Sequence, residues 1–262
     1  MEEEKNKIEI TFLGTGTSTG VPVVGCNCDV CTSTNPKDKR FRTSAILSYK
    51  GKNIAIDCSP DFRFQMLRNK IMDLDAIIFT HGHRDHIAGL DDIRGYNYIL
   101  NKKIEIFSSK EVLESLQTAF PYIFNNTRYF GAPQINTHII KNEPFYIDDI
   151  KINPIKVLHN KMEVFGYRIK NFTYITDASY ISEKEMTKLY NSEILVINAL
   201  RKSKHLSHFS LQEALDVIAK VKPKKAYITH MSHLFGKHDE VEKTLPKNVF
   251  LAYDDLKIEV EG

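Results

Sequence analysis

The stretch Thr80-His81-Gly82-His83-Arg84-Asp85-His86 (THGHRDH, residues 80–86) places three imidazoles and a carboxylate on one short segment, directly after an apolar run. Neutral imidazoles and carboxylates are ligands for zinc, manganese and iron, and a short turn can direct several of them into one cleft. A polar turn of hydrogen-bonded histidines is the alternative, but clustered His and Asp mark metal sites far more often than packing. The stretch therefore predicts a metal site.

Further ligand candidates follow other apolar segments. His159 comes after Leu158, Asp177 after Thr176, and His230 after Thr229. Residues at strand ends, on loops held by a rigid sheet, are where active sites usually lie. One metal ion needs three or four ligands, so this number of candidates predicts two ions. A pair about 3.5–4 Å apart is the arrangement that hydrolytic enzymes use.

The composition is that of an ordinary globular protein. The 262 residues are 42% hydrophobic and 26% charged. No apolar run approaches the ~20 residues that span a bilayer, and the start MEEEKNKIEI does not resemble a signal peptide. We therefore expect a cytoplasmic protein with no membrane partner. A net charge of +3 is too even to require a nucleic-acid partner, and we do not expect one.

The pattern predicts one α/β domain over residues 1–262, without repeats or linkers. The expected strands are Ile8–Leu13, Thr43–Tyr49, Asn53–Asp57, Ala76–Thr80, Ile104–Ser108, Ile150–Val157, Phe165–Lys170, Thr173–Thr176, Ile194–Asn198, Ala226–Thr229, Val249–Ala252 and Lys257–Val260. The expected helices are Lys110–Phe120, Glu183–Tyr190 and Leu211–Val221. Ser210 and Glu213 predict a capping box for the last helix.

With these residues in view, THGHRDH resembles the motif of the metallo-β-lactamase superfamily, whose fold is a four-layer αβ/βα sandwich. The resemblance implies one metal on His81, His83 and His159 and a second on Asp85, His86 and His230, with Asp177 bridging both. It also implies that metal-bound hydroxide is the nucleophile. His86 is typical of two-metal members that cut phosphodiesters or thioesters, which argues against a lactamase proper.

Three cysteines, Cys26, Cys28 and Cys31, form the spacing C-x-C-x-x-C in GCNCDVC. The expected compartment disfavours disulfides, and the spacing is not that of thioredoxin. A structural zinc needs four ligands, and His233 is the best candidate for the fourth. Cys58 lies apart, and we expect it to be a small buried apolar residue.

A closer resemblance extends along nearly the whole chain. The segment GTGTSTGVPVVGCNCDVC is similar to the PhnP-like branch of the superfamily, named for a phosphodiesterase that acts on phosphoribosyl 1,2-cyclic phosphate. In that branch three cysteines and the second His of T-H-x-S-H hold a structural zinc. THMSH is present here, so the resemblance implies a zinc on the cysteine cluster and His233.

Hydrolysis of a phosphodiester with a poor leaving group calls for a proton donor, and His serves this role near neutral pH. His208 lies two residues before the Ser210 cap, at the positive end of a predicted helix, where a phosphate would bind. The resemblance gives a His at this point the role of general acid. We expect His208 and Asp85 to be needed for catalysis, and His205, His138 and His238 to be solvated.

Substrate contacts are harder to identify. Gly14 and Gly16 predict a tight turn beneath the metal site, since the G-K-[ST] ending of a P-loop is missing. We expect Ser18 or Thr19 on that turn to face substrate, and Arg94, two residues after Asp92, to bind a phosphate. An ion pair on a helix surface is an equally good account of Arg94.

The leading hypothesis is a binuclear phosphodiesterase for a small (cyclic) phosphate ester such as phosphoribosyl 1,2-cyclic phosphate. A tRNase Z-like endonuclease and a thioester or acyl hydrolase are the alternatives, and a non-catalytic module is disfavoured because all seven expected ligands are present. Zinc, manganese and iron all suit the active-site ligands. The aromatic stretch Ala119–Phe130 is either a lid over the substrate or a homodimer face.

Overall fold

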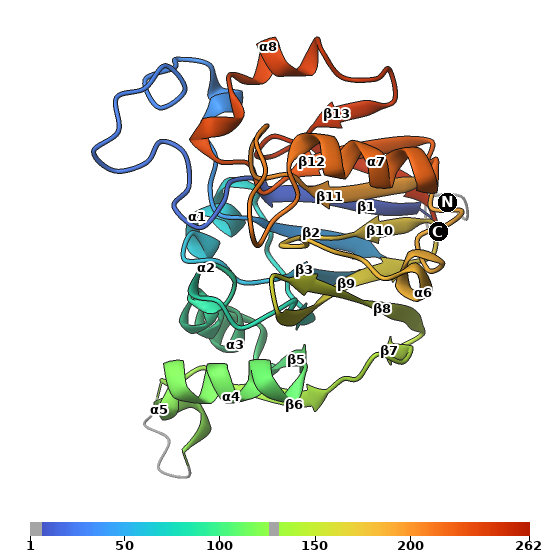
Figure 1. Ribbon diagram of the computed structural model, residues 1–262. Coiled ribbons are helices and arrows are strands. Elements are labelled where there is room, and N and C mark those ends of the chain that lie inside the picture. Colours follow the sequence, from blue (N-terminus) through green and yellow to red (C-terminus); the bar gives the residue numbers. More distant parts are fainter. Residues whose placement is uncertain (1–6, 126–130) are drawn as a thin grey trace.

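The computed structural model describes residues 7–125 and 131–262, and in these it shows two seven-stranded β-sheets that pack face to face (Figure 1). Helices cover the outer face of each sheet. The predicted four-layer αβ/βα sandwich is therefore confirmed. None of the helices in the described ranges has the length and apolar character needed to cross a membrane.

The two sheets divide the chain into an N-terminal and a C-terminal half, except that the last strand returns to the first sheet. The first sheet has the order β14 (Lys257–Glu261), β1 (Lys7–Gly14), β2 (Ser44–Tyr49), β3 (Lys52–Ile56), β4 (Ala76–Ile78), β5 (Ile104–Ser108) and β6 (Ile135–Ile139). The second has the order β13 (Val249–Leu251), β12 (Lys225–Thr229), β11 (Ile194–Asn198), β10 (Phe172–Tyr174), β9 (Met162–Ile169), β8 (Ile150–His159) and β7 (Phe145–Ile147).

The helices are short and follow the strands. The α-helices of the described residues are α1 (Phe62–Arg68), α2 (Arg84–Ile87), α3 (Arg94–Leu100), α4 (Lys110–Ala119), α5 (Pro121–Phe124), α6 (Glu183–Met186), α7 (Leu211–Val221) and α8 (His238–Glu242). The 3₁₀ helices are η2 (Pro36–Asp38), η3 (Leu90–Ile93) and η4 (His233–Phe235). The predicted capping box of α7 is confirmed, because the Ser210 N–H donates to the Glu213 carboxylate and Ser210 Oγ accepts from the Glu213 N–H.

All twelve predicted strands are present, with ends that differ by up to three residues. The prediction missed β6 and β7, as well as the short helices α1 and α3. In β6 four of five residues are exposed, so no apolar alternation marks this edge strand. The predicted helix Glu183–Tyr190 is shorter, since α6 ends at Met186.

The aromatic stretch Ala119–Phe130 lies only partly within the described residues. Its first part forms the end of α4 and all of α5, and Phe120 and Ile123 are buried beneath the first sheet. Residues 126–130 lie outside the described ranges. The choice between lid and homodimer face therefore stays a prediction.

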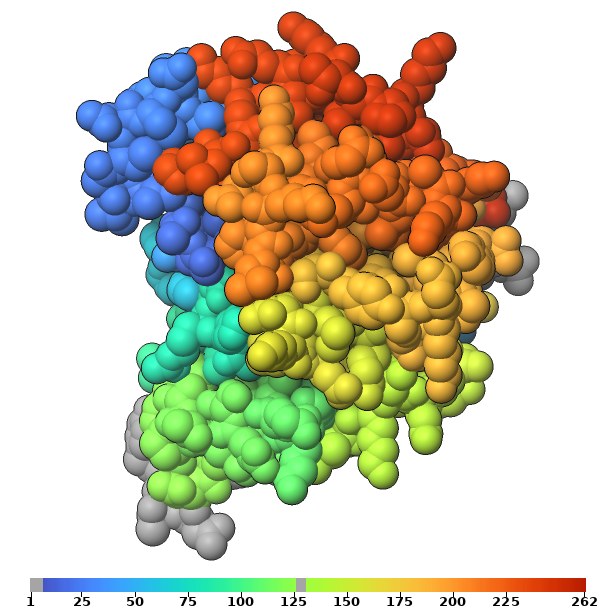
Figure 2. Space-filling view, in the orientation of Figure 1, coloured from blue at the N-terminus to red at the C-terminus, as the bar shows by residue number. Residues whose placement is uncertain are grey.

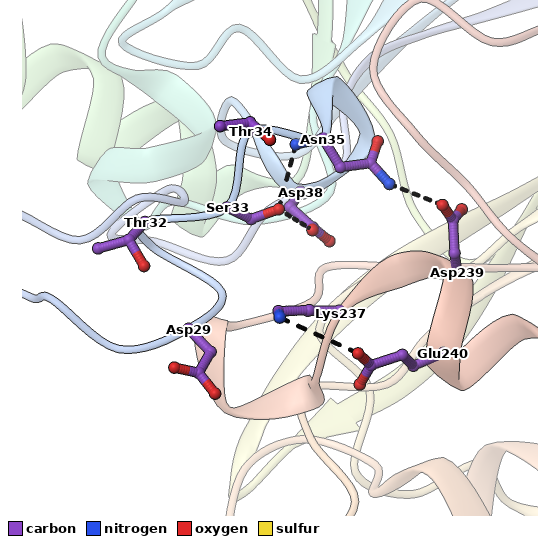
Figure 3. A pocket seen from close by; sticks show the side chains of 9 residues that line it. All are labelled: Asp29, Thr32, Ser33, Thr34, Asn35, Asp38, Lys237, Asp239 and Glu240. Atoms are coloured by element: carbon purple, nitrogen blue, oxygen red, sulfur yellow. Dashed lines mark hydrogen bonds and ion pairs between the residues drawn. The ribbon is translucent and has the colours of Figure 1, made fainter.

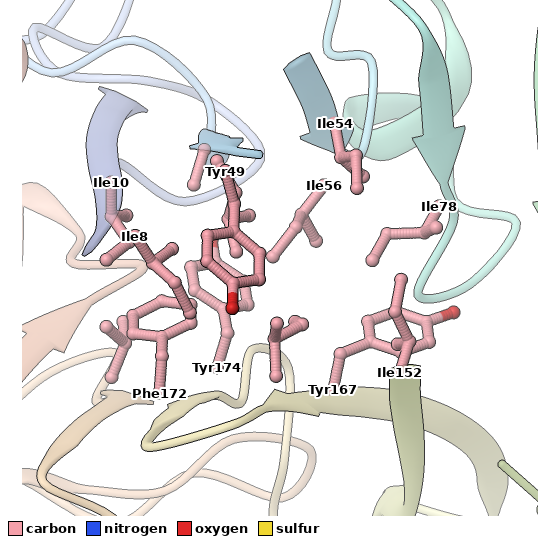
Figure 4. Packing of buried hydrophobic residues seen from close by; sticks show 14 of the residues in the cluster. Ile8, Ile10, Tyr49, Ile54, Ile56, Ile78, Ile152, Tyr167, Phe172 and Tyr174 are labelled. Atoms are coloured by element: carbon pink, nitrogen blue, oxygen red, sulfur yellow. The ribbon is translucent and has the colours of Figure 1, made fainter. Parts of the chain in front are cut away.

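The space between the sheets is filled by alternating side chains from both inner faces. Ile8, Ile10 and Ile56 of the first sheet face Tyr167 and Phe172 of the second (Figure 4). All five of these side chains are fully buried. Burial of such apolar surface is the main stabilising contribution to the fold.

The strand directions bring the ligand candidates to one edge. In the second sheet β10, β11 and β12 are parallel, and β8 runs the same way because β9 is antiparallel to both β8 and β10. The carboxyl ends of these strands therefore meet at one edge. His159 ends β8, Asp177 follows β10, and His230 follows β12.

One hydrogen bond joins the two sheets through the buried core. The hydroxyl of Tyr167 on β9 donates to the carbonyl oxygen of Phe79, which follows β4, over 2.5 Å. Because Tyr167→Phe leaves that buried carbonyl without this donor, we expect unfolding to become easier by about 1–2 kcal/mol. The urea midpoint at constant slope measures this change.

Tyr49→Phe is the matched control. The Tyr49 hydroxyl is buried and has no hydrogen-bond partner among the described residues, so its removal should leave the stability unchanged or raise it. An equal loss in both variants would show that the Tyr167–Phe79 bond contributes nothing specific.

Candidate metal centre

The carboxylate of Asp177 lies at the centre of the site, where the edges of the two sheets meet. Its Oδ2 is 3.2 Å from His86 Nε2 and 3.3 Å from His230 Nδ1. Its Oδ1 is 4.0 Å from His81 Nε2 and 3.7 Å from His208 Nδ1. The side chain is almost fully buried. Four imidazoles from both sheets therefore converge on one carboxylate.

The three histidines expected at the first metal lie together. The ring of His81 is 4.7 Å from that of His83 and 5.7 Å from that of His159, and the last two are 5.1 Å apart. His159 Nδ1 donates to the backbone oxygens of Asp177 and Ser207. Since carbonyl oxygens only accept, Nδ1 carries the proton and Nε2 keeps a free lone pair. His83 is exposed at the rim.

The residues expected at the second metal also converge. Asp85 Oδ2 is 3.3 Å from His86 Nε2, and the His230 ring stacks on the His86 ring at 5.8 Å. His86 Nδ1 bonds the Asp57 carboxylate at 2.7 Å, which directs Nε2 toward Asp85 and Asp177. Although burial lowers the pKa of His86, Asp177 and Asp57 raise it well above its usual value.

Asp57 is a positioning residue that the sequence analysis placed only as the last residue of a strand. Besides His86 it accepts hydrogen bonds from the backbone N–H and the hydroxyl of Thr80, both at 2.8 Å. It is fully buried. The available signal was a carboxylate at the end of the apolar run IAID, the same pattern that marks the other strand-end ligands.

Three of these side chains stand on strained backbone. Asp57, Asp177 and His230 have positive φ angles of 63°, 57° and 59°. This left-handed conformation costs residues with a side chain roughly 1–2 kcal/mol each. Each of these residues follows a strand, and the left-handed backbone turns the chain there so that the side chain faces the centre of the site.

The atoms that face the centre lack partners, and this tests whether metal ions fit. His81 Nε2, His86 Nε2, His230 Nδ1 and His208 Nδ1 are buried without a hydrogen bond to any described residue. Burial keeps the His81 pKa well below its usual value, so its ring is neutral. Burial raises the pKa of Asp177, but His230 and His86 bring it well below the usual range. Imidazole nitrogens around an ionised carboxylate are a donor set for divalent metals.

The donor atoms form two groups that share Asp177, and these groups differ from the two ligand sets that the resemblance implies. The donor atoms of His81, His86 and Asp177 lie within 4.8 Å of one another, as do those of His159, Asp177 and His208. The first group combines His81 and His86, which were expected at different ions, and the second includes His208, which was expected to be the general acid and not a ligand. The division of the ligands between two metals therefore stays a prediction.

His208 lies against the centre, as its place before the α7 cap predicts. Its ring is 4.6 Å from His159 and 4.9 Å from His230. Burial, followed by the charge of His230, lowers the pKa of His208 to about 3. His205, expected to be solvated, is half-buried and its ring lies 5.3 Å from His208. The pair forms one wall of the site.

The weaker substrate candidates have different outcomes. Ser18 is exposed on the turn below the site, where its neighbour Thr17 contacts His230 Nε2 at 3.2 Å. Thr17 was not predicted. Arg94 forms an ion pair with Asp91 at 2.8 Å on a half-exposed helix surface. This pair is the alternative that the sequence left open for Arg94.

Two further expectations concern histidines without a motif. His138 is partly exposed and bonds Glu105. The expectation that His238 is solvated is wrong, because its side chain is fully buried and its Nδ1 lies 3.2 Å from Arg40 Nη2. No motif marks His238 in the sequence, and its contact with the buried Arg40 forms only in the folded chain.

The glycine turn passes beneath the site as predicted. Gly16 forms backbone bridges with both Arg42 and Met231, the residue after His230. A Cβ on Gly14 would lie 2.0 Å from the Arg42 carbonyl oxygen, so any residue with a side chain would clash at this position. Gly14 thus allows close contact with Arg42, and the Gly16–Met231 bridge holds the N-terminal turn against the His230 turn.

The cysteine cluster assembles away from Asp177. His233 Nδ1 lies 3.3, 3.4 and 3.6 Å from the sulfurs of Cys26, Cys28 and Cys31. Zinc bonded tetrahedrally at about 2.3 Å to sulfur and about 2.0 Å to nitrogen places those atoms about 3.5 Å apart. The four donors therefore fit a structural zinc. Cys58 is fully buried, as expected.

The loop that carries the cysteines packs on α8, and Figure 2 shows this blue segment against the red-orange C-terminal region. A cavity of about 420 Å³ lies between them (Figure 3). Its polar side chains bond one another, with Ser33 donating to Asp38 and Asn35 to Asp239. The cluster thus joins segments that are distant in sequence.

Replacing one cysteine should separate this cluster from the Asp177 centre. We expect Cys28→Ala to contain about one metal ion fewer per chain and to unfold at a markedly lower temperature, because a structural metal contributes directly to folding. Elemental analysis and thermal denaturation measure both. Cys58→Ala is the control and should keep the full metal content; an unchanged metal content in Cys28→Ala would contradict the assignment.

Comparison with known proteins agrees with this geometry. Residues 52–231 match the family described as the beta-lactamase superfamily domain. A solved structure described as a new diphosphatase from the PhnP family has a TM-score of 0.92 and 38% identity, covering 97% of this chain and 98% of that chain.

Two relatives of greater length also match. An octanoyltransferase of Porphyromonas gingivalis (strain ATCC BAA-308 / W83) is 37% identical over 249 residues, 94% of this chain and 50% of the relative. A ribonuclease Z of Nostoc punctiforme is 30% identical over 166 residues, 62% of this chain and 46% of the relative. The chain thus spans about half the length of either. The family match over residues 52–231 and the similarity to the PhnP-family structure show that the chain belongs to the PhnP family of the metallo-β-lactamase superfamily.

Proposed function

We propose that this protein is a metal-dependent phosphodiesterase that acts on a small phosphate ester. The observation that carries the proposal is the ring of unpartnered imidazole nitrogens around the buried Asp177 carboxylate. His81, His83, Asp85, His86, His159, Asp177 and His230 would hold the ions. When bound, divalent cations supply Lewis-acid activation of water and neutralise charge on phosphoryl oxygens.

The remaining residues would position the substrate and move a proton. His208 is the one buried imidazole beside Asp177 in the described residues that the expected ligand set does not use. It would donate a proton to the leaving oxygen. The low pKa of its free ring fits this role only with a substrate phosphate beside it, because a nearby negative charge raises the pKa of an imidazole.

The substrate class follows from the reaction and from the PhnP-family diphosphatase. Phosphoribosyl 1,2-cyclic phosphate and a diphosphate both present a phosphorus bonded to two ester or anhydride oxygens, which suits the same attack. The Cys26–Cys31 cluster and the mild net charge favour a small substrate over RNA. The ribonuclease Z relative supports the same phosphodiester chemistry.

Acyl hydrolysis is the second candidate, and one observation favours it. The octanoyltransferase of Porphyromonas gingivalis shares 37% identity across 94% of this chain. The match covers only half of that protein, so its activity need not reside in the shared part. Hydrolysis of an octanoyl thioester by the purified protein separates this candidate from the first.

The proposal is tested by metal content and hydrolysis of bis(p-nitrophenyl) phosphate on the same preparations. We expect about three metals per chain in the wild type, and in Asp85→Ala a loss of activity of at least about 100-fold, since a ligand to a catalytic ion is removed. Cys28→Ala should lose mainly stability. Full metal content without phosphodiesterase activity, together with thioester hydrolysis, would move the assignment to acyl chemistry.

The role of His208 has its own test, because a general acid matters only for poor leaving groups. We expect His208→Ala to slow cleavage of an alkyl p-nitrophenyl diester at the alkyl ester bond by about 10²–10⁴, and to leave release of p-nitrophenolate nearly unchanged. Single-turnover rates for leaving groups of increasing pKa measure the dependence. An equal loss at both bonds would identify His208 as a ligand or positioning residue instead.

A further inference from the structure

A cationic loop borders the proposed active site. It comprises residues 199–210, joins β11 to α7, and carries Arg201, Lys202, Lys204 and His205 ahead of His208. The proposed phosphodiesterase reaction uses only His208 from this loop. Its basic side chains therefore have no role in the chemistry described so far.

The base of the cationic loop is held in place by backbone hydrogen bonds. Leu200 and Phe209 close it, with the Leu200 N–H donating to the Phe209 oxygen at 2.9 Å. The Phe209 N–H donates to Ala178, next to Asp177, and the Leu200 oxygen accepts from Ser232, two residues after His230. The loop is thus fixed to two turns that form the metal centre.

His205 brings a hydrogen-bond donor to the wall of the site. Its ring lies 5.3 Å from the ring of His208, whose Nδ1 is 3.7 Å from Asp177. The Ser207 backbone N–H donates to His205 Nδ1 at 3.3 Å, so the proton of the neutral ring is on Nε2. Because the ring is half exposed, this N–H can donate to a ligand.

The basic side chains of the loop make no direct ion pairs in the described part of the chain, although Lys204 lies near enough to Glu213 to help lower the pKa of that carboxyl. Arg201, Lys202 and Lys204 form no ion pair with any carboxylate in residues 7–125 and 131–262, whereas Arg42, Arg68 and Lys102 each do. Arg201 Nη2 donates to the Lys204 backbone oxygen at 2.8 Å, but its buried Nε has no partner in the described structure. A bound anion would satisfy this N–H and the unpaired charges.

We infer that the cationic loop binds a second, non-reacting phosphate, so that the preferred substrate is a small disubstituted diphosphate. This inference rests on the proposed phosphodiesterase function. In hydrolysis, water oxygen bonds to the attacked phosphorus, the bond from that phosphorus to the bridging oxygen breaks, and the bridging oxygen leaves with the second phosphate. One water is consumed and two phosphate monoesters form. Arg201, Lys204 and His205 hold the leaving phosphate beside His208.

Two matched substrates test the inference on the metal-loaded full chain. Bis(p-nitrophenyl) phosphate has one phosphate, and P1,P2-bis(p-nitrophenyl) diphosphate has two, with products separated by chromatography. We expect Arg201→Gln and Lys204→Gln each to lower kcat/KM for the diphosphate by about tenfold, mainly through KM, as for loss of one charge-assisted contact. Activity on the monophosphate should change less than about twofold.

The controls separate charge from folding. Arg201→Lys should restore part of the lost kcat/KM, and Lys247→Gln, an exposed lysine in the turn before β13, should change neither substrate. Melting temperatures identify any variant that is merely unstable, and Lys204→Gln alters only an exposed ammonium group.

Each outcome has a distinct meaning. Loop variants that affect both substrates equally would overturn the inference and leave the proposed function intact. A wild-type enzyme that cleaves neither substrate would overturn the proposed function and the inference with it. Cleavage of precursor tRNA in preference to the diphosphate, lost in the loop variants, would assign the loop to RNA backbone binding and overturn the small-molecule substrate.

Discussion

The buried carboxylate of Asp177 is the contact on which the rest of the site depends. His81 and His86 approach it from the first sheet, and His208 and His230 approach it from the second. Each imidazole presents a nitrogen that no described residue satisfies. Such an arrangement is costly in an apolar interior unless cations occupy it. The two halves of the sandwich are therefore joined by a polar centre that needs metal, beside an apolar core that does not.

The surrounding structure is organised to hold these groups in place. Parallel strands deliver His159, Asp177 and His230 to one edge, and left-handed backbone after two of the strands turns the side chains inward. Asp57 orients His86 from behind, and the backbone bridge from Gly16 to Met231 holds the N-terminal turn beneath the site. Strain and buried polar groups concentrate where the chemistry takes place, and the apolar core between the sheets stabilises them.

We infer that metal binding and substrate choice depend on different parts of the molecule. Strand ends supply the metal-facing side chains, and one such site can serve several hydrolytic reactions, which agrees with similar proteins as different as a diphosphatase and a ribonuclease Z. The loop between β11 and α7 carries Arg201, Lys202 and Lys204, which form no ion pair among the described residues, and we propose that it selects the substrate. The cysteine cluster is a third element, since its donors bring the loop of Cys26, Cys28 and Cys31 against His233 on η4.

The local sequence pattern was sufficient to predict most strands, the start of α7 and most of the metal-facing side chains. Apolar alternation marked twelve strands, Ser210 and Glu213 marked the start of α7, and the spacing of THGHRDH identified the donor cluster, because each of these depends on neighbours in the chain. The exposed edge strand β6 lacks such a pattern and was missed. Other features depend on residues that meet only in the folded chain. The bond from Asp57 to His86, the contact of Thr17 with His230 and the burial of His238 against Arg40 join distant segments, so only the tertiary structure decided them.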